Sequence, residues 1–305
     1  MIKKILLAGY FGYGNFGDEL LVEIFKKRMP ENFKIDTAQK MAKQPLMTLS
    51  KILKNDAFVF PGGSIFQDET SLKSVFFYIL TIFFALISGK KVFLLDQGFE
   101  ITNKFVLKVL KIALKKVKML SVRDHVSFNI LKSIGINAFL SADPVFSLEL
   151  PDLENISPKA VGIIPRGNFL LLKEPLKEIQ QNFSDLPLKI AIFSEKDRPL
   201  AEKIKKLLSL QTDIKKISKL EDLIDFFKQT GLLLCAPYHA VVVAYICGIN
   251  FRPLIYSKKV ESFLKYVEGK NRKKVCLEYK NLNCLNFNFF LNLLRGVENA
   301  NFNKS

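Results

Sequence analysis

Short apolar segments alternate with longer amphipathic ones along most of the 305 residues of this chain. Short apolar segments predict buried strands, and apolar residues spaced three and four apart predict helices that cover a sheet. Such an alternation is typical of βαβ units and therefore of a parallel sheet with helices on both faces. The sequence thus predicts an α/β protein.

The alternation is interrupted between Ser147 and Pro158, where two prolines and several acidic residues show no periodicity. We interpret this segment as a linker. The expected architecture is two Rossmann-like doubly wound domains, over residues 1–150 and 159–305, that face a ligand-binding cleft. A last helix near Phe287–Leu294 is expected to pack back on the N-terminal domain. The expected strands are Lys4–Ala8, Lys34–Asp36, Ala57–Phe60, Val92–Asp96, Met119–Val122, Ala138–Leu140, Val161–Ile164, Lys189–Phe193, Leu232–Cys235 and Pro253–Tyr256.

The formal net charge of +17 favours an anionic partner. A nucleic-acid-binding chain would show basic clusters interleaved with aromatic residues, or a helix motif that reads bases. The lysines here are scattered, and the basic run Lys270–Lys274 is interpreted as a solvated turn. We therefore expect a small anionic metabolite, and no nucleic acid.

One apolar run and one basic helix face raise the question of a membrane. Val75–Ile87 is the most hydrophobic stretch, yet it is well short of the roughly 20 residues that span a bilayer, so a buried helix is expected. Lysines recur at helical spacing shortly afterwards, which indicates either a solvated face or a peripheral contact with anionic lipid. These lysines are Lys104, Lys108, Lys111 and Lys115.

A glycine-rich loop, Gly9–Glu19, joins the first expected strand to a helix for which Asp18 is the expected N-cap. Glycines allow backbone N–H groups to approach an anion, and a helix N-terminus favours negative charge. Gly12–Gly17 matches G-x-G-x-x-G, and Asp36 follows at the distance expected of a ribose-binding acid, so a dinucleotide site is an alternative. Asp18 and Glu19 argue against it, because they place two negative charges where a pyrophosphate would bind.

Further polar residues follow other strands at the same expected sheet edges. Gly62-Gly63-Ser64 follows the third strand, where it is either a ligand-binding turn or a tight turn before a helix capped by Asp68 or Thr70. Arg123 is either an anion ligand or part of a salt bridge with Asp124. In the second half, Arg166 ends a strand, and Tyr238-His239 lies between a strand and a helix, where an imidazole can transfer protons. No cysteine pair has CxxC spacing, so no metal is expected.

In their joint order these blocks resemble the polysaccharide pyruvyl transferase family. The resemblance covers roughly residues 1–268 and rests on the opening glycine loop and on the blocks that follow it. These blocks are Gly62-Gly63-Ser64 with Gln67-Asp68 and Thr70-Ser71, Ser121–Asp124, Ala142–Pro144, Gly162-Ile163 with Arg166, Tyr238–Ala240, and Tyr256 with Lys259.

The resemblance implies a glycosyltransferase-B-like pair of domains. It also implies a cytoplasmic transferase that modifies cell-wall or other cell-surface polysaccharide. The implied reaction moves pyruvate from phosphoenolpyruvate onto two hydroxyls of a glycan sugar, as a ketal, and releases phosphate. The acceptor would be a polysaccharide or its lipid-linked precursor at the inner face of the membrane. Phosphoenolpyruvate is the donor substrate, and no other cofactor is expected.

For the site, we expect His239, Arg166 and Asp18 to be catalytic: an acid, a cation for the donor and a base or orienting group for the acceptor hydroxyl. The expected donor-binding residues are Gly14, Asn15, Gly17, Gly62, Gly63, Ser64, Arg123, Tyr238 and Lys259.

Pro237 departs from the family pattern, which usually has an arginine two residues before the histidine. Arg252 or Lys259 would then have to supply the missing charge. Three alternatives stay open: a glycosyltransferase that uses a nucleotide sugar, a nicotinamide dehydrogenase, and a degenerate homologue without activity.

Overall fold

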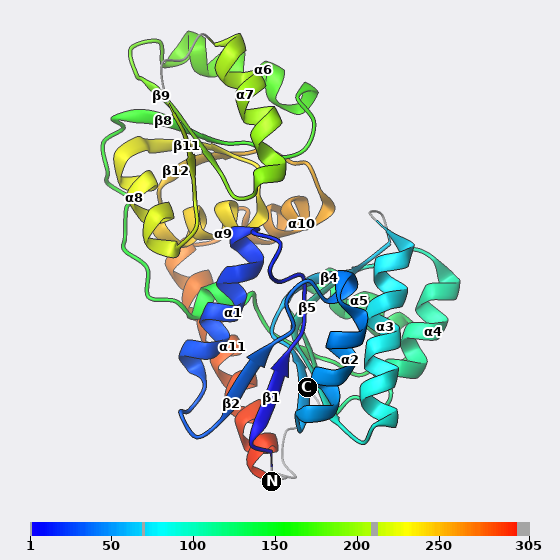
Figure 1. Ribbon diagram of the computed structural model, residues 1–305. Helices are drawn as coiled ribbons and strands as arrows, with labels where there is room; N and C mark the ends of the chain where they lie inside the picture. Colours follow the sequence, from blue (N-terminus) through cyan, green and yellow to red (C-terminus); the bar gives the residue numbers. More distant parts are fainter. Residues whose placement is uncertain (1, 69–70, 209–212, 298–305) are drawn as a thin grey trace. The chain divides into compact units, whose positions relative to one another are not determined.

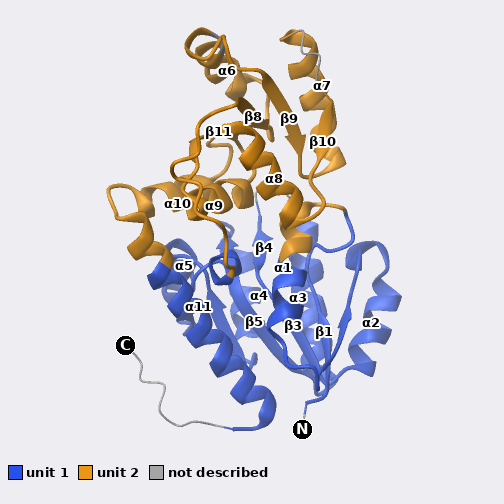
Figure 2. Ribbon diagram, turned by 90° about the vertical axis from the view of Figure 1, so that its left-hand side faces the viewer, with its two compact units in different colours: residues 1–13, 21–147, 277–305 blue, residues 14–20, 148–276 orange. Residues whose placement is uncertain are grey.

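The computed structural model describes residues 2–68, 71–208 and 213–297, and the chain divides into two compact units. Unit 1 comprises residues 1–13, 21–147 and 277–305, and unit 2 comprises residues 14–20 and 148–276 (Figure 2). The boundary after Ser147 lies at the start of the expected linker. Residues 14–20, expected in the N-terminal domain, belong instead to unit 2. Residues 277–297 belong to unit 1, the domain on which the last helix was expected to pack.

The described residues of unit 1 form a seven-stranded parallel sheet in the order β2-β1-β3-β5-β6-β7, with β4 paired to β5 (Figure 1). The order changes direction at β1, whose neighbours are β2 and β3, so the loops after β1 and β3 flank a topological switch point. The strands are β1 Lys4–Leu7, β2 Lys34–Thr37, β3 Ala57–Phe60, β4 Gly63–Gln67, β5 Lys91–Glu100, β6 Met119–Val122 and β7 Phe139–Leu140. The helices include α2 Pro45–Lys54, α3 Leu72–Ile87, α4 Lys104–Leu114 and α5 His125–Ser133.

Alternate residues of β3 supply two separate cores, as expected for a strand buried on both faces. Phe58 and Phe60 pack in the core beneath α2, α3, α4 and α5, whereas Ala57 and Val59 pack in the core beneath α1 (Phe16–Arg28) and α11 (Arg272–Arg295). Figure 1 shows α2 and α3 on one side of the strands and α1 and α11 on the other.

The described residues of unit 2 form a five-stranded parallel sheet in the order β10-β9-β8-β11-β12. Numbered within the unit, this order is 3-2-1-4-5, the strand order of dinucleotide-binding folds, with its switch point between β8 and β11. The strands are β8 Ala160–Ile164, β9 Leu188–Ile192, β10 Ile214–Lys216, β11 Gly231–Cys235 and β12 Asn250–Pro253. The helices are α6 Leu170–Asn182, α7 Arg198–Leu207, α8 Leu220–Thr230, α9 Tyr238–Cys247 and α10 Lys258–Val267.

Several expectations about local structure were wrong. The basic run expected to be a turn includes the start of α11, which begins at Arg272 and is much longer than the predicted final helix. Helix α1 begins at Phe16, so Asp18 lies inside its first turn and is not its N-cap. Asp68 and Thr70 were the expected caps of α3. Asp68 instead accepts hydrogen bonds from the backbone N–H groups of Thr102 and Asn103, and Thr70 lies outside the described residues. Ser71 caps the helix by accepting a hydrogen bond from the backbone N–H of Ser74.

The predicted buried helix at Val75–Ile87 exists as most of α3, although one of its faces is exposed. No helix among the described residues is long and apolar enough to cross a membrane.

Candidate functional site

Three predicted site residues of unit 2 follow strands that are neighbours in its sheet. Arg166 follows β8, His239 lies in the first turn of α9 after β11, and Lys259 lies in the first turn of α10 after β12. Because all three strands are parallel, their carboxyl ends share one edge of the sheet. Arg166 and His239 lie on either side of the switch point, where α/β sheets of this kind bind ligands.

The second half of the glycine-rich loop belongs to the same edge. The backbone N–H of Phe16 donates a hydrogen bond of 2.9 Å to the carbonyl of Phe193, just beyond β9, and the two rings pack edge to face at 4.7 Å. Asn15 Oδ1 accepts a hydrogen bond of 3.0 Å from Arg166 Nη2. These contacts explain why residues 14–20 belong to unit 2.

Gly17 lies directly against the imidazole of His239. A Cβ atom built on Gly17 would lie 2.1 Å from His239 Nδ1, which no real Cβ could tolerate. The imidazole is half-buried and contacts the edge of the Tyr238 ring at a centroid distance of 5.4 Å. Tyr238 itself is buried against Phe263, so its ring supports the histidine from the core side.

The Arg166 guanidinium forms a two-pronged ion pair with Asp197. Nε donates to Oδ1 at 3.2 Å and Nη2 donates to Oδ2 at 2.8 Å, and the side chains are 22% and 8% exposed. With the bond to Asn15, this fixes the plane of the guanidinium. Asp197 was not predicted as a site residue, although its position just after an expected strand end could have indicated it.

Asp18 lies among cations at this edge. Burial raises the pKa of its carboxyl, while a hydrogen bond from Asn15 and the charges of Lys259 and Arg166 pull the pKa down; the net direction is upward. The carboxylate also lies in the first turn of α1, where the helix dipole favours negative charge. Gly14, just before, has a positive φ of 70°, which favours glycine.

Four predicted donor-binding residues lie in unit 1: Gly62, Gly63, Ser64 and Arg123. Gly62 and Gly63 have φ values of 131° and 99°, which L side chains rarely adopt. Arg123 donates from Nη1 to Asp143 at 3.0 Å and from Nη2 to Ser64 at 2.5 Å, and its side chain is 2% exposed. The expected ion pair with Asp124 is also present, with 3.6 Å between Arg123 Nε and Asp124 Oδ2. Through its bond to Ser64, Arg123 holds the glycine turn in place.

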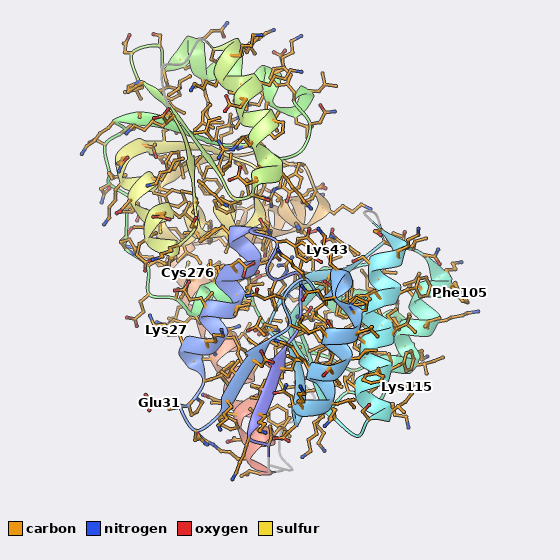
Figure 3. The ribbon with its side chains drawn as sticks, viewed as in Figure 1. Lys27, Glu31, Lys43, Phe105, Lys115 and Cys276 are labelled. Atoms are coloured by element: carbon orange, nitrogen blue, oxygen red, sulfur yellow. The ribbon has the colours of Figure 1, made fainter. Side chains whose placement is uncertain are left out.

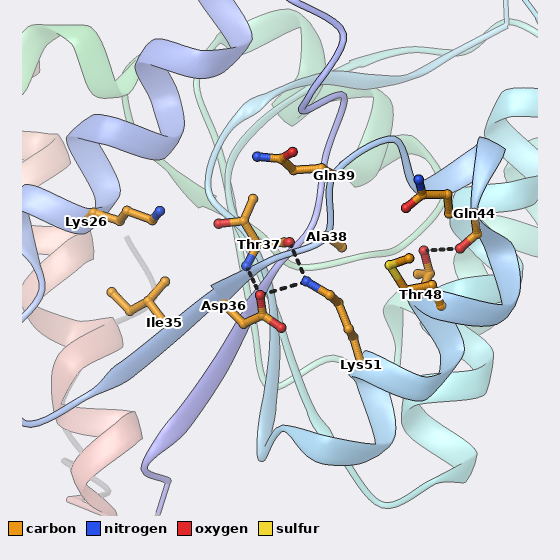
Figure 4. A pocket seen from close by; sticks show the side chains of 10 residues that line it. Lys26, Ile35, Asp36, Thr37, Ala38, Gln39, Gln44, Thr48 and Lys51 are labelled. Atoms are coloured by element: carbon orange, nitrogen blue, oxygen red, sulfur yellow. Dashed lines mark hydrogen bonds and ion pairs between the residues drawn. The ribbon is translucent and has the colours of Figure 1, made fainter.

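A cavity of about 380 Å³ lies beside Asp36 at the end of β2 in unit 1 (Figure 4). The Asp36 carboxylate accepts a hydrogen bond of 2.8 Å from Lys51 and another from the backbone N–H of Thr37. The acid expected to hold a ribose is thus already paired. Among the described residues, no group of three or more His, Cys, Asp and Glu side chains is placed to hold a metal ion.

A family model described as "Polysaccharide pyruvyl transferase" matches residues 15–258, well over half of the chain. The chain belongs to the polysaccharide pyruvyl transferase family. The match begins at Asn15 and includes Arg166, Asp197 and His239. A search of curated protein sequences gave no match.

Solved structures similar to this pyruvyl transferase family member share its fold at low sequence identity. UDP-GlcNAc 2-epimerase from Neisseria meningitidis, bound to UDP-GlcNAc, has a TM-score of 0.59 and 11% identity over 95% of this chain and all of its own. A putative UDP-N-acetylglucosamine 2-epimerase from Listeria monocytogenes has a TM-score of 0.56 and 13% identity over 92% of this chain and 87% of its own. The chain therefore has a glycosyltransferase-B-like α/β fold of Rossmann-like units.

Proposed function

We propose that this protein transfers a pyruvyl group from phosphoenolpyruvate to a glycan sugar, as a ketal across two hydroxyls, with release of phosphate. The observation that carries the proposal is the grouping of Arg166, His239 and the Asn15–Asp18 segment at one sheet edge of unit 2. This grouping combines a cation, an imidazole and a carboxylate, which are the groups that the reaction requires.

Phosphoenolpyruvate carries a carboxylate and a phosphate, so its binding site must supply cations and N–H donors. Asn15, Asp197 and Tyr256 hold the Arg166 guanidinium in place, and its positive charge attracts an anionic oxygen of the donor. Lys259 is the second cation, and its charge already acts on the neighbouring Asp18. Arg252, the other substitute considered for the missing family arginine, is instead paired with Glu178 at the surface.

The chemical step requires a proton at the methylene carbon of the donor. We assign this proton to the His239 imidazolium. Protonation makes the neighbouring carbon electrophilic; one sugar hydroxyl then forms a C–O bond to it, and the second displaces phosphate. The two attacking hydroxyls lose one proton each. We assign one of these protons to Asp18, from which His239 is recharged after the reaction, and the other leaves with the released phosphate. The raised pKa of Asp18 makes it a better base near neutral pH than an ordinary aspartate.

A nucleotide-sugar transferase is the second candidate. The epimerase structures with this fold are named for UDP-N-acetylglucosamine, and one of them is bound to UDP-GlcNAc. A dinucleotide enzyme is less well supported, because Gly17 of the G-x-G-x-x-G motif closes against His239 and Asp36 is paired with Lys51.

A thermal-shift panel separates these candidates, because a ligand that binds only the native state raises its melting temperature. The panel contains phosphoenolpyruvate, UDP, UDP-GlcNAc and NAD. We expect phosphoenolpyruvate to stabilise the protein. Stabilisation by UDP-GlcNAc alone would favour the second candidate. Phosphate release from phosphoenolpyruvate in the presence of a glycan acceptor would exclude an inactive homologue.

A further inference from the structure

One face of helix α3 is apolar and exposed. Its buried face, which includes Val75, Ile79 and Ile82, packs in the core of unit 1. On the opposite face, Leu80 is 64% exposed and Ile87 is 85% exposed. Four phenylalanines at matching helical spacing share this face and are only partly buried: Phe76, Phe77, Phe83 and Phe84. A helix that is apolar all round normally lies in a protein core or in lipid, and this one is covered on one side only.

Helix α4 extends this apolar face. The two helices pack side by side in the same core, and the ring of Phe76 on α3 lies 6.2 Å from that of Phe105 on α4. Phe105 is 64% exposed and Ile112, two turns later, is 60% exposed. We define the α3–α4 surface by the exposed residues Leu80, Ile87, Phe105 and Ile112 with the exposed lysines Lys104, Lys108 and Lys115. Contiguous exposed apolar residues of this kind mark interaction sites.

The charges on this surface all have one sign. Lys104, Lys108 and Lys115 are exposed and lie within about a quarter turn of Phe105 on the helical face of α4. Figure 3 labels Phe105 and Lys115 near the two ends of this helix. Helices α2, α3 and α4 contain no aspartate or glutamate at all. The carboxylate of Asp68, before α3, accepts hydrogen bonds from the backbone N–H groups of Thr102 and Asn103 at the start of α4. Helices that carry lysines beside an apolar face, and no acid of their own, have the pattern of helices that lie in the interface of an anionic bilayer.

A second copy of the chain fits this surface less well. A symmetric dimer places the same patch on both sides of the interface. The lysine row would then lie close to its own copy without a carboxylate on either α3 or α4 to neutralise it. Lipid phosphates supply the negative charge that a second copy lacks.

We propose that the α3–α4 surface binds the surface of a membrane that contains anionic lipid. The apolar side chains of Leu80, Ile87, Phe105 and Ile112 enter the headgroup boundary, and the three lysines pair with lipid phosphates. The helices lie on the bilayer and do not cross it, since α3 has only 16 residues. This proposal does not depend on the proposed reaction, because each of its residues lies in unit 1.

The test is co-sedimentation of the full chain with phosphatidylcholine vesicles that contain or lack phosphatidylglycerol. We expect binding that requires phosphatidylglycerol and weakens with added salt. Each lysine near an anionic surface contributes about fivefold in partitioning, so loss of three positive charges weakens binding on the order of 100-fold. The charge-reversal variant, which also adds three negative charges, should bind at least that much more weakly. That variant is Lys104→Glu with Lys108→Glu and Lys115→Glu.

Two further variants make the test specific. A control with the same net charge reverses lysines exposed on unit 2, and it should bind like the unaltered chain; its substitutions are Lys173→Glu, Lys206→Glu and Lys228→Glu. Leu80→Ser with Ile87→Ser should weaken binding while circular dichroism and melting temperature stay close to those of the unaltered chain. Equal losses in both charge variants, no vesicle binding, or a dimer in light scattering that Leu80→Ser abolishes would each overturn the proposal.

Discussion

The imidazole of His239 packs directly against Gly17, in the space that a side chain at position 17 would fill. A Cβ atom on Gly17 would lie 2.1 Å from His239 Nδ1. Gly17 does not have the positive φ that marks many of the other glycines, so space alone explains its presence. The contact joins the glycine loop to the helix that carries the proposed acid.

Gly17→Ala should therefore displace the imidazole and destabilise the protein by about 1–3 kcal/mol, the usual cost of overpacking. The measurement is a double-mutant cycle in urea unfolding with His239→Ala. Once the imidazole is removed, we expect the alanine at position 17 to cost little, because alanine is a better helix former than glycine. Additive effects of the two substitutions would show that the contact is not responsible.

His239→Ala should lower the turnover of phosphoenolpyruvate by a factor of about 100 to 10,000, the usual contribution of a positioned acid. The assay is phosphate release in the presence of a glycan acceptor, with circular dichroism to check the fold. His125→Ala alters the chain's other histidine, which is exposed on α5, and should leave the rate unchanged. A near-normal rate in the His239 variant would remove the histidine from the mechanism.

Arg123→Met should destabilise unit 1 by about 3–5 kcal/mol, because it leaves the Asp143 carboxylate buried without its cation. The matched control is Lys177→Met, which breaks the exposed ion pair with Glu174 and should cost less than about 1 kcal/mol. Denaturation in guanidinium chloride gives the free energy of unfolding of each variant for the comparison. Similar small losses in both would indicate that Arg123 does not anchor the Ser64 turn.

Asp96 should make stability depend on acid pH. Its carboxyl is buried in unit 1, and burial raises its pKa to about 6 despite hydrogen bonds from Ser121 and the charge of Arg28. An unfolded aspartate titrates near 3.9. Between about pH 4 and pH 6 the folded state therefore keeps a proton that the unfolded state has lost, and stability falls as pH rises.

Asp96→Asn removes this titration. We compare the free energy of unfolding of the unaltered chain with that of the variant. The difference should fall by about 3 kcal/mol between pH 4 and pH 7, because about two pH units separate the pKa of Asp96 in the folded and unfolded states. Urea unfolding at several pH values provides the measurement. A difference that stays constant over this range would contradict the assignment.

Alternation of apolar segments was enough to predict the α/β fold, and strands such as Ala57–Phe60 and Met119–Val122 were placed at their observed bounds. The strand β4, Gly63–Gln67, was missed because it begins at the second of two glycines and resembles a turn in the sequence. The start of α11 was missed because its basic residues were interpreted as a solvated turn, and because its asparagines and cysteines have low helix propensity. Packing of its later aromatic residues on Phe25 stabilises the helix.

The sequence correctly placed Arg166 and His239 just after strands, because the apolar segments that form strands can be recognised in the sequence. The Asp197 carboxylate was not, since pairing between loops that are distant in the sequence depends on the strand order of the sheet, which no local pattern encodes. Gly17 was among the expected donor-binding residues, but its contact with His239, more than two hundred residues away in the sequence, was not predicted for the same reason.

Titration calorimetry with phosphoenolpyruvate, on the unaltered chain and on Arg166→Met, tests the central claim most directly. Arg198→Met is the control. Arg198 directly follows Asp197 in the sequence, but its side chain is exposed and pairs with Glu195. The account predicts that the unaltered chain and the control bind phosphoenolpyruvate and that Arg166→Met does not. Equal binding by all three proteins, or binding of UDP-GlcNAc in place of phosphoenolpyruvate, would contradict it.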